Sequence, residues 1–88
     1  MKTVWKYQFL VVDDLVVNMP EGAQVLSVQV QGIEPCIWAL VDPDAPLVER
    51  RLHVRGTGHP FVGNEGRFVG TFQMLRGRFV GHLFEDAE

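Results

Sequence analysis

A short run of basic side chains near the middle of the chain carries the groups best suited to bind an anion. Alternate residues there are Arg51, His53 and Arg55, and a glycine-rich segment with Thr57 and His59 follows them. Guanidinium groups form paired hydrogen bonds with phosphates and carboxylates, and open backbone N–H groups bind the same anions. We therefore expect a ligand-binding site at these five residues. The other interpretation of the pattern is a solvated strand face followed by a turn.

The three histidines, the serine and the cysteine form no catalytic or metal-binding motif. His53, His59 and His82 lack the paired spacing of metal ligands, and no cysteine stands in a chelating position beside them. Ser27, the only serine, lies in a regularly alternating segment and not at a nucleophile elbow. Cys36 lies in an apolar run, where a thiol is usually a small core residue. We therefore expect a protein that is not an enzyme and that has no metal and no cofactor.

Two acids and the aromatic rings also have a structural interpretation. Asp42 and Asp44 could act as paired carboxylates, but both stand beside prolines, where aspartate commonly caps a turn. Aromatic rings can stack on nucleobases, although such rings normally line a basic groove and this chain has a net charge of −3. We expect most of the rings in the core and no nucleic-acid partner.

Chain length and charge distribution limit the class of protein further. The sequence has 88 residues, which predicts one domain over residues 1–88. Asp13 and Asp14 interrupt the longest apolar region, so we expect no membrane-spanning segment and no membrane partner, and the N-terminus lacks the pattern of a signal peptide. A single cysteine fits a reducing compartment. Acids predominate before Arg50 and arginines from Arg50 onward.

Apolar and polar side chains alternate in short segments, which is the period of β-strands. We expect seven strands, at residues 3–10, 14–18, 24–31, 36–41, 49–55, 67–75 and 79–85. Turns rich in proline and glycine separate them, including residues 42–46 and a two-residue hairpin connection at Arg76 and Gly77. The fold class predicted is all-β, a small single-domain sandwich or partly open barrel of about seven short, mainly antiparallel strands.

The alternation also predicts which side chains fill the core. The residues expected to point inward are Leu26, Val28, Val30, Phe68, Phe72 and Met74, together with either Phe79 and Leu83 or Val80 and Phe84. The continuous apolar run at residues 36–41 predicts a central strand covered on both faces, with Trp38 as an anchor of the core. Residues 85–88 are expected to form a frayed acidic tail.

Several segments are similar to a known group of proteins. They are Met19-Pro20-Glu21-Gly22-Ala23, Leu26-Ser27-Val28-Gln29, Trp38-Ala39-Leu40-Val41-Asp42, Gly56-Thr57-Gly58-His59-Pro60 and Gly70-Thr71-Phe72-Gln73. Together they resemble a family of short uncharacterised proteins, a domain of unknown function, encoded by tailed bacteriophages and prophages. The resemblance covers almost the whole chain. It implies a phage accessory protein located in the cytoplasm of the bacterial host.

These observations lead to two hypotheses about function. The first is a non-catalytic phage accessory binding protein that engages a host protein or a small anionic ligand through the Arg51, His53 and Arg55 face, with counteraction of host defence as one form of this role. The second is a minor structural or assembly component of the phage particle. A small domain with exposed strand edges gains buried area by pairing, so we also expect a homo-oligomer.

Overall fold

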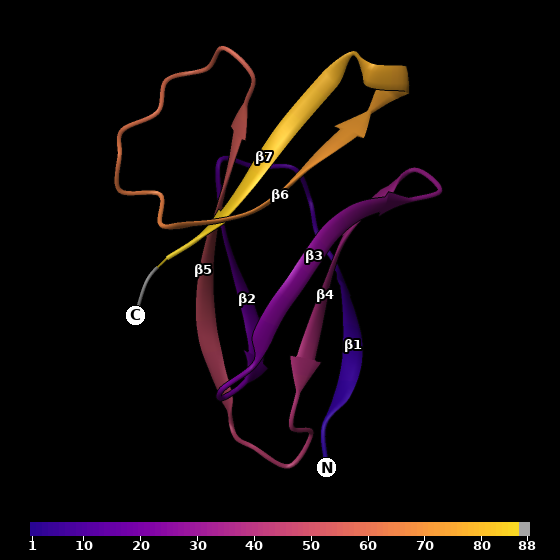
Figure 1. Ribbon diagram of the computed structural model, residues 1–88, viewed down its shortest axis with the longest axis vertical. Coiled ribbons are helices and arrows are strands. Elements are labelled where there is room, and N and C mark those ends of the chain that lie inside the picture. Colours follow the sequence, from indigo (N-terminus) through magenta and orange to yellow (C-terminus); the bar gives the residue numbers. More distant parts are fainter. Residues whose placement is uncertain (87–88) are drawn as a thin grey trace.

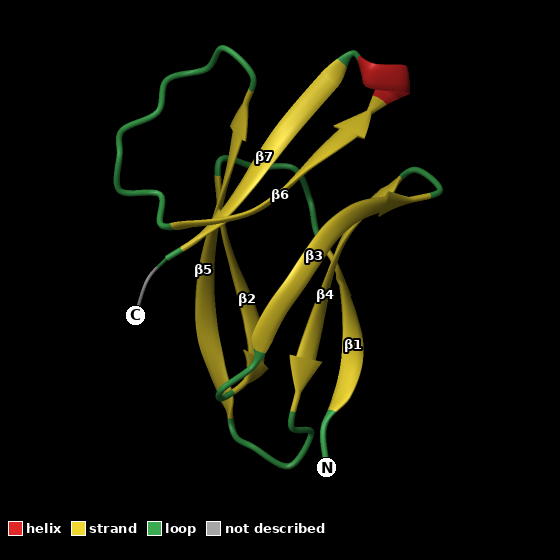
Figure 2. Ribbon diagram, in the orientation of Figure 1, coloured by secondary structure: helices red, strands yellow, loops and turns green. Residues whose placement is uncertain are grey.

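The structure is a computed structural model that describes residues 1–86 as two antiparallel β-sheets packed on each other (Figures 1 and 2). A three-stranded sheet has the order β1-β4-β3, and a four-stranded sheet has the order β2-β5-β7-β6. The strands are β1 (Thr3–Gln8), β2 (Asp14–Pro20), β3 (Gln24–Gln31), β4 (Glu34–Val41), β5 (Leu47–Gly56), β6 (Arg67–Met74) and β7 (Phe79–Glu85). A single helical turn, η1 (Leu75–Gly77), joins β6 to β7. The all-β prediction is confirmed.

The core lies between the two sheets and is filled from alternate positions of the strands. Ile37 and Val41 on β4 are buried in it, as are Leu52 on β5 and Leu83 on β7. Each such side chain stabilises the fold by about 1.5–3 kcal/mol when it leaves water. The position of Leu83 decides the orientation of β7 in favour of the Phe79 and Leu83 alternative. Within residues 1–86 no helix is long and apolar enough to cross a membrane.

Two β-bulges change which side chains point inward. Between Val25 and Ser27 the register of β3 shifts, so Val25 and Val28 are buried whereas Leu26 is 45% exposed. A second shift, between Phe68 and Gly70 on β6, leaves Phe68 53% exposed. The predictions that Leu26 and Phe68 point inward are therefore wrong, because a bulge places two residues opposite one and reverses the alternation beyond it.

Trp38 does not anchor the core. β4 is the central strand of its sheet, as predicted, but Ile37 and Ala39 face the core while Trp38 points to the opposite face, beside Lys6 of β1. A continuous apolar run gives both faces of a strand the same character, so it does not identify the inner one. Cys36 is buried, as predicted.

The predicted acidic tail is wrong for the two of its residues that the structure describes. Glu85 is the last residue of β7, and its side chain is only 6% exposed. Its carboxylate accepts a hydrogen bond of 2.7 Å from Nε of Arg50 and one of 3.1 Å from Nη2 of Arg67. The N–H of Asp86 donates to the carbonyl oxygen of Arg51. Residues 87–88 lie outside the described part of the chain.

The turns follow the prediction in one case and depart from it in another. Asp42 accepts a hydrogen bond from the N–H of Asp44 at 3.0 Å, which confirms that Asp42 caps a turn. The β6–β7 connection spans residues 75–78 and is longer than the predicted two residues, and Leu75 (φ 54°), Arg76 (φ 57°) and Gly77 (φ 84°) in it all adopt left-handed backbone. Leucine and arginine are strained in that region, where their Cβ approaches the backbone.

Candidate functional site

The outer face of the four-stranded sheet, the face that points away from the core, carries the predicted basic residues. Arg51, His53 and Arg55 alternate on β5 with the buried Leu52 and Val54, so all three share this face, as the spacing predicted. The register of the sheet places Asp14 of β2 and Phe84 of β7 directly beside His53.

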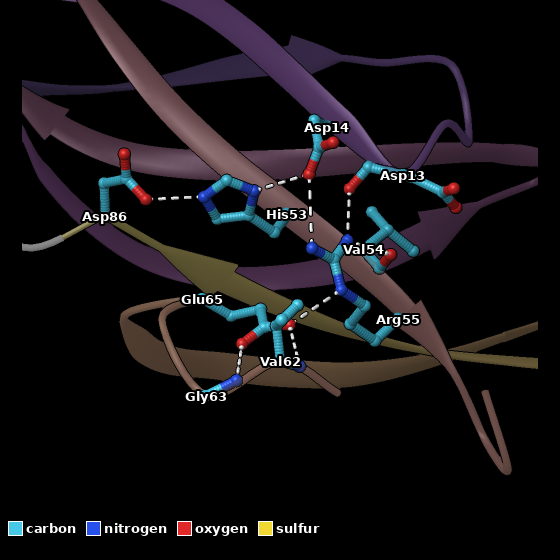
Figure 3. Close-up of polar contacts among 9 residues, drawn as sticks. All are labelled: Asp13, Asp14, His53, Val54, Arg55, Val62, Gly63, Glu65 and Asp86. Carbon is cyan, nitrogen blue, oxygen red and sulfur yellow. Dashed lines mark hydrogen bonds and ion pairs between the residues drawn. The ribbon is translucent and has the colours of Figure 1, made fainter. Parts of the chain in front are cut away.

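His53 lies between two carboxylates (Figure 3). Its Nδ1 is 2.7 Å from Oδ1 of Asp14, and its Nε2 is 2.5 Å from Oδ1 of Asp86. Partial burial of the ring alone would lower its pKa, but the hydrogen bonds and charges of Asp14 and Asp86 outweigh this effect and raise the pKa of His53 above its usual 6.5. The same contact lowers the pKa of Asp14. The doubly hydrogen-bonded ring is therefore best satisfied as an imidazolium.

Arg55 is also surrounded by oxygen atoms. Its Nε donates to Oε2 of Glu65 at 3.0 Å, its Nη1 donates to the carbonyl oxygen of Asp13 at 2.7 Å, and its Nη2 donates to Oδ1 of Asp14 at 3.3 Å (Figure 3). The Asp14 carboxylate thus contacts both His53 and Arg55. Together they join the beginning of β2, the C-terminal part of β5 and the loop at residues 57–66 into one polar network.

Glu65 is the residue that fixes this loop. Its side chain is fully buried, and its carboxylate accepts hydrogen bonds from the N–H of Val62 at 2.9 Å and of Gly63 at 2.8 Å. Burial alone would raise the pKa of the Glu65 carboxyl, but these two hydrogen bonds and the Arg55 guanidinium lower it to about 2. Glu65 is therefore ionised at neutral pH and holds the loop against β5.

Thr57 and His59 occupy two different places beside this network. The hydroxyl of Thr57 lies 2.8 Å from Nε2 of His82, whose Nδ1 lies 2.9 Å from the hydroxyl of Thr71. His59 instead lines a shallow cavity of about 300 Å³ with Asp13, Asp14, Arg55, Pro60 and Val62. Of the five predicted site residues, Arg55 and His59 share this cavity.

The network neutralises most of the positive charge that the sequence placed on this face. The donors of Arg55 and both nitrogens of His53 are engaged by carboxylate or carbonyl oxygens. An anion that entered the cavity would have to displace Asp14 or Glu65, and each displacement would leave a buried or partly buried charge without a partner. Arg51 differs, since it is exposed and forms no ion pair within residues 1–86.

An aromatic patch, formed by Phe61, Phe68 and Phe84, lies on the same face. The ring centroids of Phe61 and Phe84 are 5.2 Å apart, and those of Phe68 and Phe84 are 5.5 Å apart. Phe61 is 56% exposed and Phe68 is 53% exposed. The rings come from the loop, β6 and β7, and Phe84 adjoins His53 in the sheet register. The face therefore combines a neutralised polar network with exposed aromatic surface.

Sequence reasoning missed both the carboxylates and the aromatic patch. Asp14 and Asp86 are far from β5 in the chain and reach His53 through strand pairing, whereas Glu65, ten residues after Arg55, reaches it through closure of the loop. One local signal existed for Glu65, which stands between Gly63 and Gly66 in a loop where backbone N–H groups are open to an acceptor. Phe68 is predicted in the core because strict alternation takes no account of the bulge in β6, for which Gly70 within the strand is a local signal.

The stability of the domain should depend on pH through His53. A group whose pKa is raised on folding stabilises the folded state fully at a pH below its unfolded pKa, which is 6.5 for histidine. This stabilisation is lost as the pH rises through the pKa of the folded state. We expect the difference in unfolding free energy between the native chain and His53→Gln to be largest below about pH 6.5 and to decrease as the pH rises above it. Urea unfolding at successive pH values measures it. In a background of Asp14→Asn with Asp86→Asn the decrease should vanish, and a constant difference in the native background would contradict the assignment.

Comparison with known proteins identifies the family of the chain. No curated protein and no solved structure matches it. The model of one protein family, described as a domain of unknown function (DUF7352), matches residues 1–88. The chain therefore belongs to the DUF7352 family.

Proposed function

We propose that this domain is a non-catalytic accessory binding protein of tailed bacteriophages and prophages that engages a host protein in the bacterial cytoplasm. The binding surface is the outer face of the four-stranded sheet, with the aromatic patch on the side of β6 and β7 and Arg51 on β5. The phage context rests on what the resemblance of the segments at residues 19–23, 26–29, 38–42, 56–60 and 70–73 to a family of phage and prophage proteins implies.

The observation that carries the proposal is the exposure of two phenylalanine rings in contact with a third. Phe61 and Phe68 each expose more than half of their surface, yet both pack against Phe84 and are held in place. Rigid exposed aromatic side chains lose little entropy on association and are enriched at the centres of protein interfaces. An exposed arginine near such rings supplies the polar rim that these interfaces usually have.

A protein partner fits this face better than a small anion does. The small anionic ligand expected from Arg51, His53, Arg55, Thr57 and His59 needs free cationic donors, whereas His53 and Arg55 already contact carboxylates. A protein surface requires only Arg51 and the rings, and it leaves the network intact.

A structural role in the phage particle is the second candidate, and the free edges of β1 and β2 favour it. A groove of about 480 Å³ lies between these edges, and Tyr7, Phe9, Leu15 and Val17 are among the residues that line it. The hydroxyl of Tyr7 is buried and has no hydrogen-bond partner in the described part of the chain. A strand from another copy could pair with either edge, which would produce the homo-oligomer expected from the size of the domain.

The two candidates are separated by a comparison of matched surface variants. Phe61→Ser with Phe68→Ser removes the aromatic patch, whereas Val4→Ser with Leu26→Ser removes similarly exposed apolar side chains from the other sheet. With tagged chains expressed in a bacterial host, we expect one host protein to co-purify at near-equal amount with the native chain and the control. Loss of two interface anchors should reduce its recovery at least about tenfold. Equal recovery with both variants would contradict the proposal, and fixed stoichiometry in purified virions would support the structural role.

A further inference from the structure

Two hairpin turns lie next to each other at one end of the molecule, far from the aromatic patch. The β3–β4 turn consists of Gly32 and Ile33, and the β6–β7 turn is η1 (Figure 1). A cleft of about 440 Å³ separates them, and both turns line it, together with Val30 and Met74. We refer to these two turns, residues 32–33 and 75–77, as the hairpin tips.

Each hairpin tip presents an aliphatic side chain to solvent. Ile33 is 81% exposed and Leu75 is 69% exposed, and neither belongs to the core or to the residues packed on it. Turn positions are usually occupied by glycine, asparagine, aspartate or serine. Leu75 in addition adopts φ 54°, where glycine would be free of strain. Strained residues persist where the surroundings hold them, and they often mark sites of interaction.

Cationic groups accompany these aliphatic side chains. Arg76 belongs to the second tip and Arg78 follows it, and both are exposed with no ion pair in the chain up to residue 86. Near the first tip, Nζ of Lys6 on β1 donates to Oε1 of Gln31, the last residue of β3, at 2.7 Å. The carboxylate of Glu34, next to Ile33, accepts a hydrogen bond from Gln8. This end of the molecule is therefore basic, although the whole chain has a net charge of −3.

We propose that the hairpin tips dock the domain on an anionic lipid bilayer, with Ile33 and Leu75 inserted among the acyl chains and the arginines at the headgroup phosphates. The shape of the hairpin tips favours a bilayer over a protein. A bilayer deforms around two side chains that project from separate turns, whereas a protein partner would need one matching pocket for each of them. Exposed apolar groups flanked by basic groups bind such membranes through apolar burial and attraction to anionic lipids. This surface is separate from the aromatic patch, so the inference does not depend on the proposed function.

Vesicle co-sedimentation tests the proposal. With vesicles of phosphatidylglycerol and phosphatidylcholine we expect the native chain to sediment, and either Ile33→Ser or Leu75→Gly should weaken partitioning about tenfold. Leu75→Gly should fold at least as stably as the native chain, because glycine adopts the left-handed backbone without strain. Loss of binding by this variant would therefore not reflect unfolding. Leu47→Ser, which removes an aliphatic side chain that is 65% exposed at the first residue of β5, outside the hairpin tips, is the control and should bind as the native chain does.

Charge is tested separately with Arg76→Gln and Arg78→Gln. Each arginine near an anionic surface should contribute about fivefold to partitioning, and added salt should weaken the binding of the native chain. Failure of the native chain to sediment with anionic vesicles would overturn the proposal. So would equal binding to pure phosphatidylcholine, or equal loss with Leu47→Ser. None of these results bears on co-purification of a host protein through Phe61 and Phe68, so the two proposals fail independently.

Discussion

Replacing Glu85 by alanine is expected to lower the free energy of unfolding by about 4 kcal/mol. The Glu85 carboxylate is 2.6 Å from Nη2 of Arg50, and the two side chains are only 6% and 13% exposed. Nη1 of Arg50 also donates to the carbonyl oxygen of Ala23 at 2.7 Å, so the guanidinium is held between the sheets. Without Glu85 it becomes a buried charge with no counter-ion, which is the costliest consequence of breaking such a pair. Urea unfolding followed by circular dichroism measures the loss.

The matched control is Arg67→Ala, which removes the other partner of Glu85. Arg67 is 56% exposed, and exposed ion pairs contribute only about 0–1 kcal/mol, so the loss should be small. A double variant, Arg50→Met with Glu85→Leu, should recover most of the stability, since apolar replacement removes both charges from the core together. If Glu85→Ala were no more destabilising than Arg67→Ala, the buried pair would not have the role assigned to it.

Replacing Gly66 by alanine is expected to lower the free energy of unfolding by about 3 kcal/mol or more. Gly66 adopts φ 93°, and a Cβ there would overlap the carbonyl oxygen of Glu85 and lie 2.6 Å from its carbonyl carbon. Both are backbone atoms of β7, so neither can move aside as a side chain does. The loop at residues 57–66 would have to leave the sheet, and the contacts of Glu65 with Arg55 and of Phe61 with Phe84 would go with it.

Gly63→Ala is the control that separates backbone strain from steric overlap. Gly63 has φ 101°, but a Cβ there would meet no atom within 4 Å. Its cost should be about 1 kcal/mol, the penalty for a side chain at positive φ alone. Gly66→Ala should also weaken capture of a host protein more than Gly63→Ala does, because Phe61 belongs to the loop that would be displaced. Equal stability of the two variants would show that the close approach of Gly66 to β7 is not required.

The all-β fold and most of its strands could be predicted from the sequence. β3 has the predicted bounds, and on β5 the alternation of Leu52 and Val54 with Arg51, His53 and Arg55 identified the inner and outer faces correctly. These features are local, since a period of two between turns rich in proline and glycine depends only on neighbours along the chain.

The bulges, the inner face of β4 and the partners of the basic residues could not be predicted in this way. Leu26 and Phe68 are predicted in the core because an alternating pattern does not reveal a shift of strand register. Trp38 is predicted there because a continuous apolar run does not reveal which of its two faces packs on the other sheet. The candidate site shows the same limit. Sequence alone determined that Arg51, His53 and Arg55 share one outward strand face.

Only the tertiary structure decided how the charges on that face are paired and which other side chains lie beside them. Asp14, Glu65 and Asp86 reach His53 and Arg55 through strand pairing and loop closure across separations of 10 to 41 residues. These contacts turn a row of cations into a neutral network beside exposed aromatic rings. The physical reason is that a carboxylate neutralises a cation according to their distance in space, and strand register, which depends on the packing of the whole core, sets that distance.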